Sequence, residues 1–80
     1  MAADIPQLVG YLVHALVDDP DKVTIVEKKV GEDLLFEVTV SPEDVGKLIG
    51  RQGRIVKAIR TLARAAGATT HSDVNVEIQG

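Results

Sequence analysis

Two glycines separated by two residues form the part of this chain with the clearest chemical potential. In Gly50-Arg51-Gln52-Gly53, the glycines lack the Cβ atoms that would keep a sugar-phosphate chain at a distance, and they allow one helix to turn into another within a few residues. A helix that starts after Gly53 offers free N–H groups and a partial positive charge to the same backbone. The spacing therefore predicts a phosphate clamp. Its nearby cations are Lys47, Arg51, Arg54 and Lys57, and its apolar walls, able to receive unstacked bases, are Ile49 and Ile55.

Charge is segregated along the chain, although its net charge is −3. Residues 45–67 hold six basic residues and no acidic one, whereas the remainder holds three basic and twelve acidic residues. A polyanion responds to the local field within about 10 Å, so the net charge does not exclude a nucleic acid. Judged from charge alone, this basic segment could equally be a solvated helix face that binds no polyanion.

The elements that must position this stretch begin with an amphipathic helix. Apolar residues recur from Ile5 to Val17 at helical spacing, with Asp4 as the predicted cap and Pro6 in the first turn. The segment Asp18-Asp19-Pro20-Asp21 stops this helix, because proline cannot continue it.

A hairpin is predicted next. The segment 22–30 is rich in β-branched residues, and its broken alternation at Ile25-Val26 suggests a bulge or a strand covered on both faces. After Gly31, residues 34–40 alternate, with Leu34, Phe36, Val38 and Val40 on one face. The short link containing Gly31 predicts an antiparallel pair.

Two helices and a last strand complete the order α-β-β-α-α-β. Ser41 is the predicted cap of a short helix that ends at Gly50, and the next helix runs from about Gly53 to Gly67. Residues 67–73 form a polar loop, and Val74, Val76 and Ile78 alternate in the last strand. The helix from Gly53 to Gly67 is expected to bury one apolar stripe, which consists of Ile55, Ala58, Ile59, Leu62 and Ala66.

These elements predict an α+β fold of two layers. A crossover through two helices makes the last strand parallel to the second. We expect a three-stranded mixed sheet with three helices on one face.

Other chemistries find little support in the sequence. The chain has no cysteine, no Walker A motif, no calcium-loop pattern and no set of nucleophile, base and orienting residue, so we expect no metal site, no cofactor and no enzymatic activity. The N-terminus has no basic segment followed by a long apolar run, and no run approaches 18 apolar residues, so we expect a cytoplasmic protein without membrane contact.

The segment Leu48-Ile49-Gly50-Arg51-Gln52-Gly53-Arg54-Ile55-Val56-Lys57-Ala58-Ile59 resembles the signature of KH domains, in which isoleucines flank a Gly-x-x-Gly loop. The element order resembles the type II KH fold, and residues 1–80 are most similar to the small single-domain KhpA family of bacterial RNA-binding proteins. The resemblance implies single-stranded RNA as ligand, with Gly50, Arg51, Gln52 and Gly53 as the loop. It also implies that residues 67–73, including Thr69, Thr70, His71 and Ser72, help to close the groove.

Family resemblance further implies partners. We expect a homodimer, a heterodimer with a larger KH-domain RNA-binding protein, and an RNA chaperone or post-transcriptional regulator that serves cell elongation and division. The alternative is a protein-interaction module in which the Gly-x-x-Gly hinge is only structural. Its dimer surface would be the free sheet edge or the outer side of the last helix, namely Val56, Arg60, Ala63 and Arg64.

Overall fold

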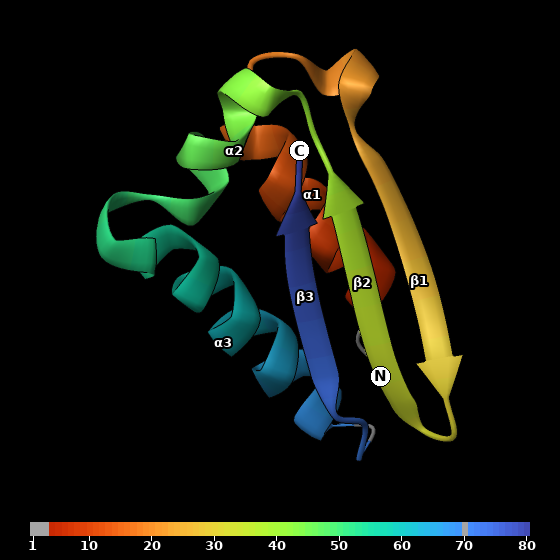
Figure 1. Cartoon of the computed structure of the whole chain (residues 1–80). Helices are drawn as coiled ribbons and strands as arrows, with labels where there is room; N and C mark the ends of the chain where they lie inside the picture. The colour runs from red at the N-terminus through yellow and green to blue at the C-terminus, as the bar shows by residue number, and fades with distance from the viewer. Residues whose placement is uncertain (1–3, 70) are drawn as a thin grey trace.

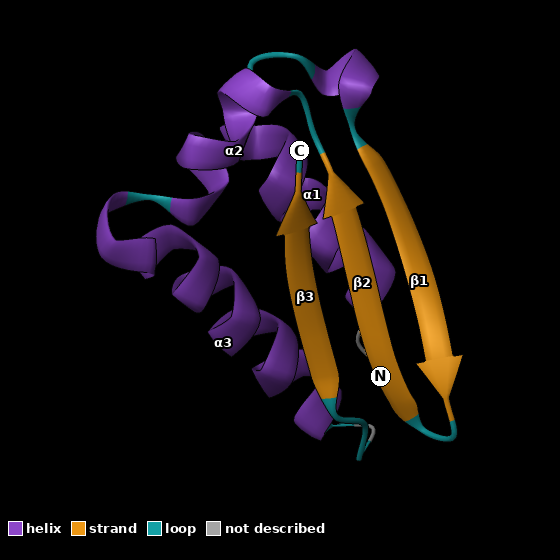
Figure 2. Ribbon diagram, viewed as in Figure 1, coloured by secondary structure: helices purple, strands orange, loops and turns teal. Residues whose placement is uncertain are grey.

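The computed structural model describes residues 4–69 and 71–80. Three helices, α1 (Ile5–Leu16), α2 (Pro42–Ile49) and α3 (Arg54–Ala68), pack on one side of a sheet of three strands (Figures 1 and 2). The strands are β1 (Thr24–Val30), β2 (Asp33–Thr39) and β3 (Val74–Gln79). Short 3-10 turns at Pro20–Lys22 and Arg51–Gly53 precede β1 and α3. The order α-β-β-α-α-β and the two-layer α+β architecture are confirmed.

The sheet has the order β1-β2-β3, with β2 in the centre. β1 and β2 are antiparallel. β2 and β3 are parallel, as predicted from the crossover connection through two helices. The even-numbered residues of β2 face the helices, and Phe36 and Val38 are completely buried among them. Val9 and Val13 of α1 and Val74 and Val76 of β3 join the same core, as do Leu48, Ile59 and Ala63.

The prediction for β1 is wrong in two respects. Its pairing with β2 is continuous from Thr24–Thr39 to Val30–Asp33, so there is no bulge at Ile25-Val26. The strand is also not covered on both faces, because only Ile25 within it is partly buried. The sequence Ile25-Val26 breaks the alternation simply because Val26 is an apolar residue on the open face, where it is 45% exposed.

α3 is rotated relative to the predicted stripe. The buried residues are Val56, Ile59, Ala63 and Gly67, while Ala58 is exposed and Leu62 is 48% exposed. Small residues lie where α3 comes closest to β3: a Cβ on Gly67 would be 2.5 Å from Cγ2 of Val74. This close approach orients the helix, so Val56 and Ala63 cannot form an outer dimer surface.

Candidate nucleic-acid interface

The predicted loop is built from α2, the 3-10 turn and the start of α3, and it forms the left margin of the molecule in Figure 1, between α2 and α3. α2 ends at Ile49, and the N–H of its C-cap residue, Gly50, donates to the Gly46 carbonyl at 2.8 Å. The Gly53 N–H donates to the Gly50 carbonyl at 3.2 Å, which closes the turn. Gly50, Gln52 and Gly53 all have positive φ, at 74°, 57° and 73°. The backbone therefore changes direction here in a way that L side chains resist.

Glycine is required at Gly50 for a second reason. A Cβ built there would lie 2.6 Å from Cγ1 of Ile55, so the Ile55 side chain packs directly on the Gly50 backbone. Ile55 is half-buried and continues into the core. Ile49 is 37% exposed. Both predicted groove residues thus lie beside the loop, and Ile55 also supports its shape.

The start of α3 is open to an anion. Gly53 occupies the N-cap position without a side-chain cap, and no acidic residue lies in the first turn. The Arg54 N–H donates to the Arg51 carbonyl within the turn. The N-terminal end of a helix nevertheless carries a partial positive charge. The loop and this helix start therefore present the same polarity to an approaching phosphate.

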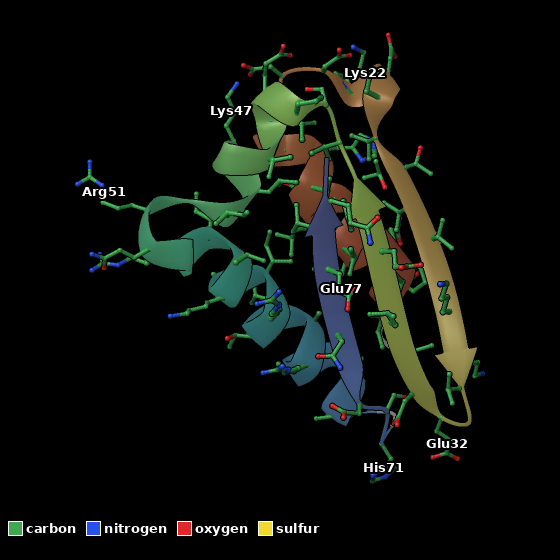
Figure 3. All side chains as sticks on the ribbon, in the orientation of Figure 1. Lys22, Glu32, Lys47, Arg51, His71 and Glu77 are labelled. Atoms are coloured by element: carbon green, nitrogen blue, oxygen red, sulfur yellow. The ribbon has the colours of Figure 1, made fainter. Side chains whose placement is uncertain are left out.

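Three cations beside the loop are unpaired in the part of the chain that the structure describes. Arg51, Arg54 and Lys57 are all exposed, and none has an acidic partner or a hydrogen-bond acceptor there. In Figure 3 the Arg51 side chain extends from the loop into solvent. Their unpaired charge is available to a polyanion.

Lys47 differs from these three cations. Its ammonium forms ion pairs with Asp18 and, at 3.4 Å, with Asp44, and these carboxylates raise the pKa of Lys47. Figure 3 shows it pointing away from Arg51. That Lys47 contacts a phosphate stays a prediction. To do so, its ammonium would have to leave the carboxylates of Asp18 and Asp44 for the phosphate.

Asp44 is a structural residue that the sequence analysis did not single out. The residue is 1% exposed, and its carboxylate accepts hydrogen bonds from the Asp18 N–H at 3.2 Å, the Asp19 N–H at 3.0 Å and the Ser41 hydroxyl at 3.2 Å. Ser41 occupies the N-cap position of α2, but the predicted side-chain cap does not form, because the Ser41 hydroxyl donates to Asp44 instead. Burial alone would raise the pKa of Asp44, but these donors and Lys47 hold it below its ordinary value.

The remaining cations of the basic segment face β3. Arg60 is half-buried, and its Nε donates to the Val76 carbonyl at 3.0 Å, while Arg64 Nη2 donates to Asn75 Oδ1 at 3.4 Å. The two arginines thus lie between α3 and the outer edge of β3. In the loop 67–73, Thr69 donates to the Ala66 carbonyl at 2.7 Å, and Thr70 lies outside the described residues.

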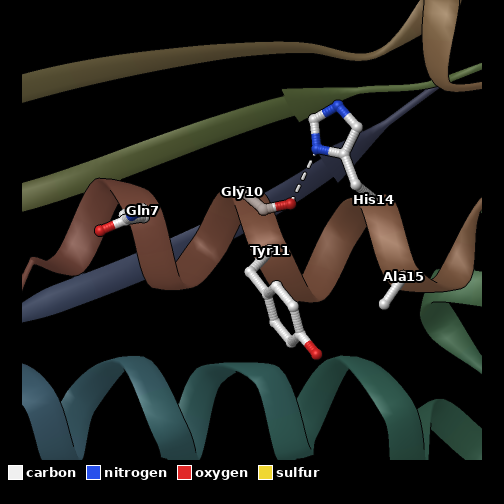
Figure 4. A pocket seen from close by; sticks show the side chains of 5 residues that line it. All are labelled: Gln7, Gly10, Tyr11, His14 and Ala15. Carbon is white, nitrogen blue, oxygen red and sulfur yellow. Dashed lines mark hydrogen bonds between the residues drawn. The ribbon is translucent and has the colours of Figure 1, made fainter.

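Elsewhere, a shallow hollow on α1 is lined by Gln7, Gly10, Tyr11, His14 and Ala15 (Figure 4). His14 Nδ1 lies 2.8 Å from the Gly10 carbonyl oxygen, and the Tyr11 ring points toward α3. No residue of the Gly-x-x-Gly loop lines it. Across residues 4–69 and 71–80, no group of acidic or histidine side chains could hold a metal ion, and none of the helices has the length and hydrophobicity that a membrane span requires.

Comparison of the sequence with known proteins identifies a family. The family described as "KhpA/KhpB, KH domain" matches residues 6–78. The RNA-binding protein KhpA of Clostridium perfringens is 47% identical over 72 residues, which cover 90% of this chain and 96% of that protein. KhpA of Listeria monocytogenes is 42% identical, covering 90% and 95%, and KhpA of Chlamydia trachomatis is 38% identical, covering 90% and 92%. No solved structure matches the chain significantly. By sequence, this chain belongs to the KhpA/KhpB family of KH domains.

Proposed function

We propose that the protein binds single-stranded RNA and holds its backbone at the Gly50–Gly53 loop. The observation that carries this proposal is the coincidence of the loop, the uncapped start of α3 and three unpaired cations at one place on the surface. Relatives that are named RNA-binding proteins match almost the whole chain. The family is one of KH domains and not of enzymes, which confirms that the chain is not an enzyme.

Each residue has a distinct role in the proposed clamp. Gly50 and Gly53 allow close approach of the sugar-phosphate backbone, and Arg51, Arg54 and Lys57 contact phosphates. Gln52 offers a polar side chain at the tip of the turn. Ile49 and Ile55 pack against bases, because the only aromatic residues, Tyr11 and Phe36, lie elsewhere.

A double substitution at the loop tests the clamp. Arg51→Asp combined with Gln52→Asp should weaken binding of a single-stranded RNA oligonucleotide at least about 30-fold, because it removes a phosphate contact and adds two negative charges beside the remaining ones. Both side chains are exposed, so the fold should be unaffected. Fluorescence anisotropy measures the affinity, and circular dichroism verifies the fold.

The matched control makes the same chemical changes away from the loop. Lys22→Asp combined with Gln7→Asp alters the net charge equally, and both residues are exposed on other elements. This control should change the affinity no more than about threefold. Equal losses in both variants would reduce the effect to net charge, and full RNA binding by the folded loop variant would refute the clamp.

A biological context follows from family membership alone. We propose that the protein acts in the cytoplasm as an RNA chaperone or post-transcriptional regulator, together with a larger KH-domain protein and in support of cell elongation and division. Co-purification of this protein with RNA and with a second KH-domain protein from its own cells tests this context. Crosslinking and sequencing of the bound RNA would identify its targets.

A further inference from the structure

Lys47 lies close to the proposed clamp, but its charge is already taken by other residues. It is in the last turn of α2, three residues before Gly50. A helix rises about 1.5 Å per residue, so the Lys47 backbone lies about 5 Å from Gly50 along the helix axis. The side chain is 44% exposed and ends in a compact ammonium on a flexible stem. By its place in the chain, Lys47 is therefore within reach of a phosphate at the loop.

Two carboxylates surround the Lys47 ammonium. It pairs with Asp18, and its Nζ lies 3.4 Å from Oδ1 of Asp44. The Asp18 side chain is 80% exposed, whereas the Asp44 side chain is 2% exposed. One ammonium and two carboxylates leave this cluster with a net charge of −1. A phosphate that approaches Lys47 therefore meets a negative cluster rather than a free cation.

Backbone hydrogen bonds hold Asp18 in this place. Its N–H donates to Asp44 Oδ1 at 3.2 Å, and the Asp19 N–H donates to Asp44 Oδ2 at 3.0 Å. These bonds fix the connection between α1 and β1 against α2, and Figure 3 shows Lys22 of that connection at the same end of the molecule as Lys47. The Asp18 carboxylate is thus placed beside Lys47 before any RNA arrives. An ion pair this exposed contributes little to folding stability, so its effect should be seen in RNA binding instead.

Cations on the two sides of the loop differ in their partners. Within the described residues, Arg51, Arg54 and Lys57 have no acidic partner. Lys47, which precedes the loop, has two. The connection that pairs with Lys47 carries three carboxylates, in residues 18–21. The unpaired positive charge thus begins at the loop and continues along α3.

We propose that Asp18 withholds Lys47 from RNA, so that the RNA-binding surface ends at the loop and does not extend onto α2. The inference rests on the proposed RNA clamp and names a residue that limits it. Asp18 itself contacts no phosphate, because it acts through Lys47. Removal of the Asp18 charge should therefore strengthen RNA binding, whereas the loss of a residue that contacts RNA weakens it.

Asp18→Asn tests this inference. The amide keeps the size of the side chain and leaves the backbone N–H bonded to Asp44, but it releases Lys47 from its exposed partner. We expect the affinity for a single-stranded RNA oligonucleotide to rise about threefold to tenfold at about 100 mM salt. Because one more phosphate is contacted, the slope of the logarithm of the association constant against the logarithm of salt concentration should become steeper by about 0.7. Fluorescence anisotropy measures both quantities.

Asp21→Asn is the matched control. It makes the same charge change in the same connection, on an exposed residue that forms no ion pair with Lys47. This control should change the affinity by less than about twofold and leave the salt slope unchanged.

A double variant shows whether the gain acts through Lys47. Asp18→Asn combined with Lys47→Gln has the net charge of the original protein, so overall charge cannot explain a difference between the two. Its affinity should return to within about twofold of the original, and its salt slope should equal the original slope. Circular dichroism and urea denaturation verify the fold, because Lys47 also contacts buried Asp44.

Side-chain NMR signals give a readout that does not depend on affinities. In the original protein, the signal of the Lys47 methylene next to the ammonium should stay unchanged as RNA is added, whereas the side-chain signals of Arg54 should shift. In Asp18→Asn, both residues should respond to RNA. A Lys47 signal that shifts equally in the two proteins would contradict the inference.

The affinities separate the possible failures. Equal gains in Asp18→Asn and Asp21→Asn would attribute the effect to net charge, and no gain in Asp18→Asn would show that the ion pair withholds nothing. A double variant that keeps the gain would show that the gain does not act through Lys47. A double variant that binds more weakly than the original, with a shallower slope, would mean that Lys47 already contacts a phosphate.

Each of these results overturns the inference and leaves the clamp standing, because the clamp is judged by the loop variant Arg51→Asp/Gln52→Asp. Full RNA binding by that folded variant would overturn both the clamp and the inference. Loss of RNA binding in the loop variant, together with a gain in Asp18→Asn that Lys47→Gln removes, is the result that we expect.

Discussion

Gly50 has a backbone conformation that other residues rarely adopt, with φ at 74° and ψ at 178°. It also touches the side chain of Ile55, which would clash with a Cβ. Gly50→Ala should therefore lower the free energy of unfolding by about 2–4 kcal/mol, through strain and overpacking together. Urea denaturation measures this change.

Gly46→Ala is the matched control for this effect. Gly46 lies within α2 with no atom within 4 Å of a built Cβ, so alanine there should be neutral or stabilise the protein by about 0.5–1 kcal/mol. Equal effects at Gly46 and Gly50 would mean that the conformation at the loop is not constrained. RNA affinity, measured on the same proteins, should fall only for the Gly50 variant.

At the scale of elements, Asp44 connects α2 to the segment between α1 and β1. It accepts the backbone N–H groups of Asp18 and Asp19, and Lys47 joins Asp44 to the Asp18 side chain. α2 leads directly into the loop, so this contact orients the first helix of the clamp. The loop is thereby positioned by residues that lie about thirty positions earlier in the chain as well as by its own glycines.

The lowered pKa of Asp44 implies a particular dependence of stability on pH. A carboxyl group whose pKa is lower in the folded state contributes stability above its unfolded pKa of about 3.9, and this contribution is lost as the pH falls through the folded value. The folded protein should thus lose stability below about pH 4. In Asp44→Asn, the melting temperature should be lower at pH 7, and its further decline in acid should be shallower.

Glu43→Gln is the control for this experiment. Glu43 is the exposed neighbour of Asp44 in the first turn of α2. The melting temperature of the Glu43→Gln protein should be close to that of the original protein both in acid and at pH 7. Differential scanning calorimetry between pH 3 and pH 7 makes the comparison. An Asp44→Asn protein with an unchanged melting temperature at pH 7 would show that the contact does not hold α2 in place.

The elements could largely be predicted from the sequence because their signals are local. Each signal is contained in a few neighbouring residues. Examples are the helical spacing of apolar residues in α1, the alternation that places Phe36 and Val38 on one face of β2, and the glycines of the loop. The rotation of α3 could not be predicted, because it depends on how closely Gly67 approaches Val74. The burial of Asp44 could not be predicted for the same reason, because its partners come from a distant part of the chain.

The candidate site could be predicted in part. Its loop and its three unpaired cations lie together as the sequence suggests, since they share one short segment. The ion pairs of Lys47 were not predicted, because Asp18 is far away in the sequence. The contacts of Arg60 and Arg64 with β3 also depend on tertiary structure, so the sequence does not predict them.

At the scale of the whole molecule, charge is segregated: a chain of net charge −3 carries six basic residues and no acidic one within residues 45–67. If Arg51, Arg54 and Lys57 each neutralise one phosphate, the logarithm of the RNA association constant should fall with the logarithm of salt concentration at a slope of about −2. Arg54→Gln should make this slope shallower by about 0.7. Titrations between 50 mM and 300 mM salt measure both slopes, and an unchanged slope in Arg54→Gln would remove Arg54 from the contact set.

The location of bound RNA on the folded chain tests the central claim most directly. A titration of isotope-labelled protein with a short single-stranded RNA, followed by amide chemical shifts, reports every backbone position at once. We predict that the largest changes fall on Gly50–Gly53 and the first turns of α3, with small changes on β1 and α1. Saturable RNA binding that leaves the signals of Gly50–Gly53 unchanged would contradict the proposal that this loop is the RNA clamp.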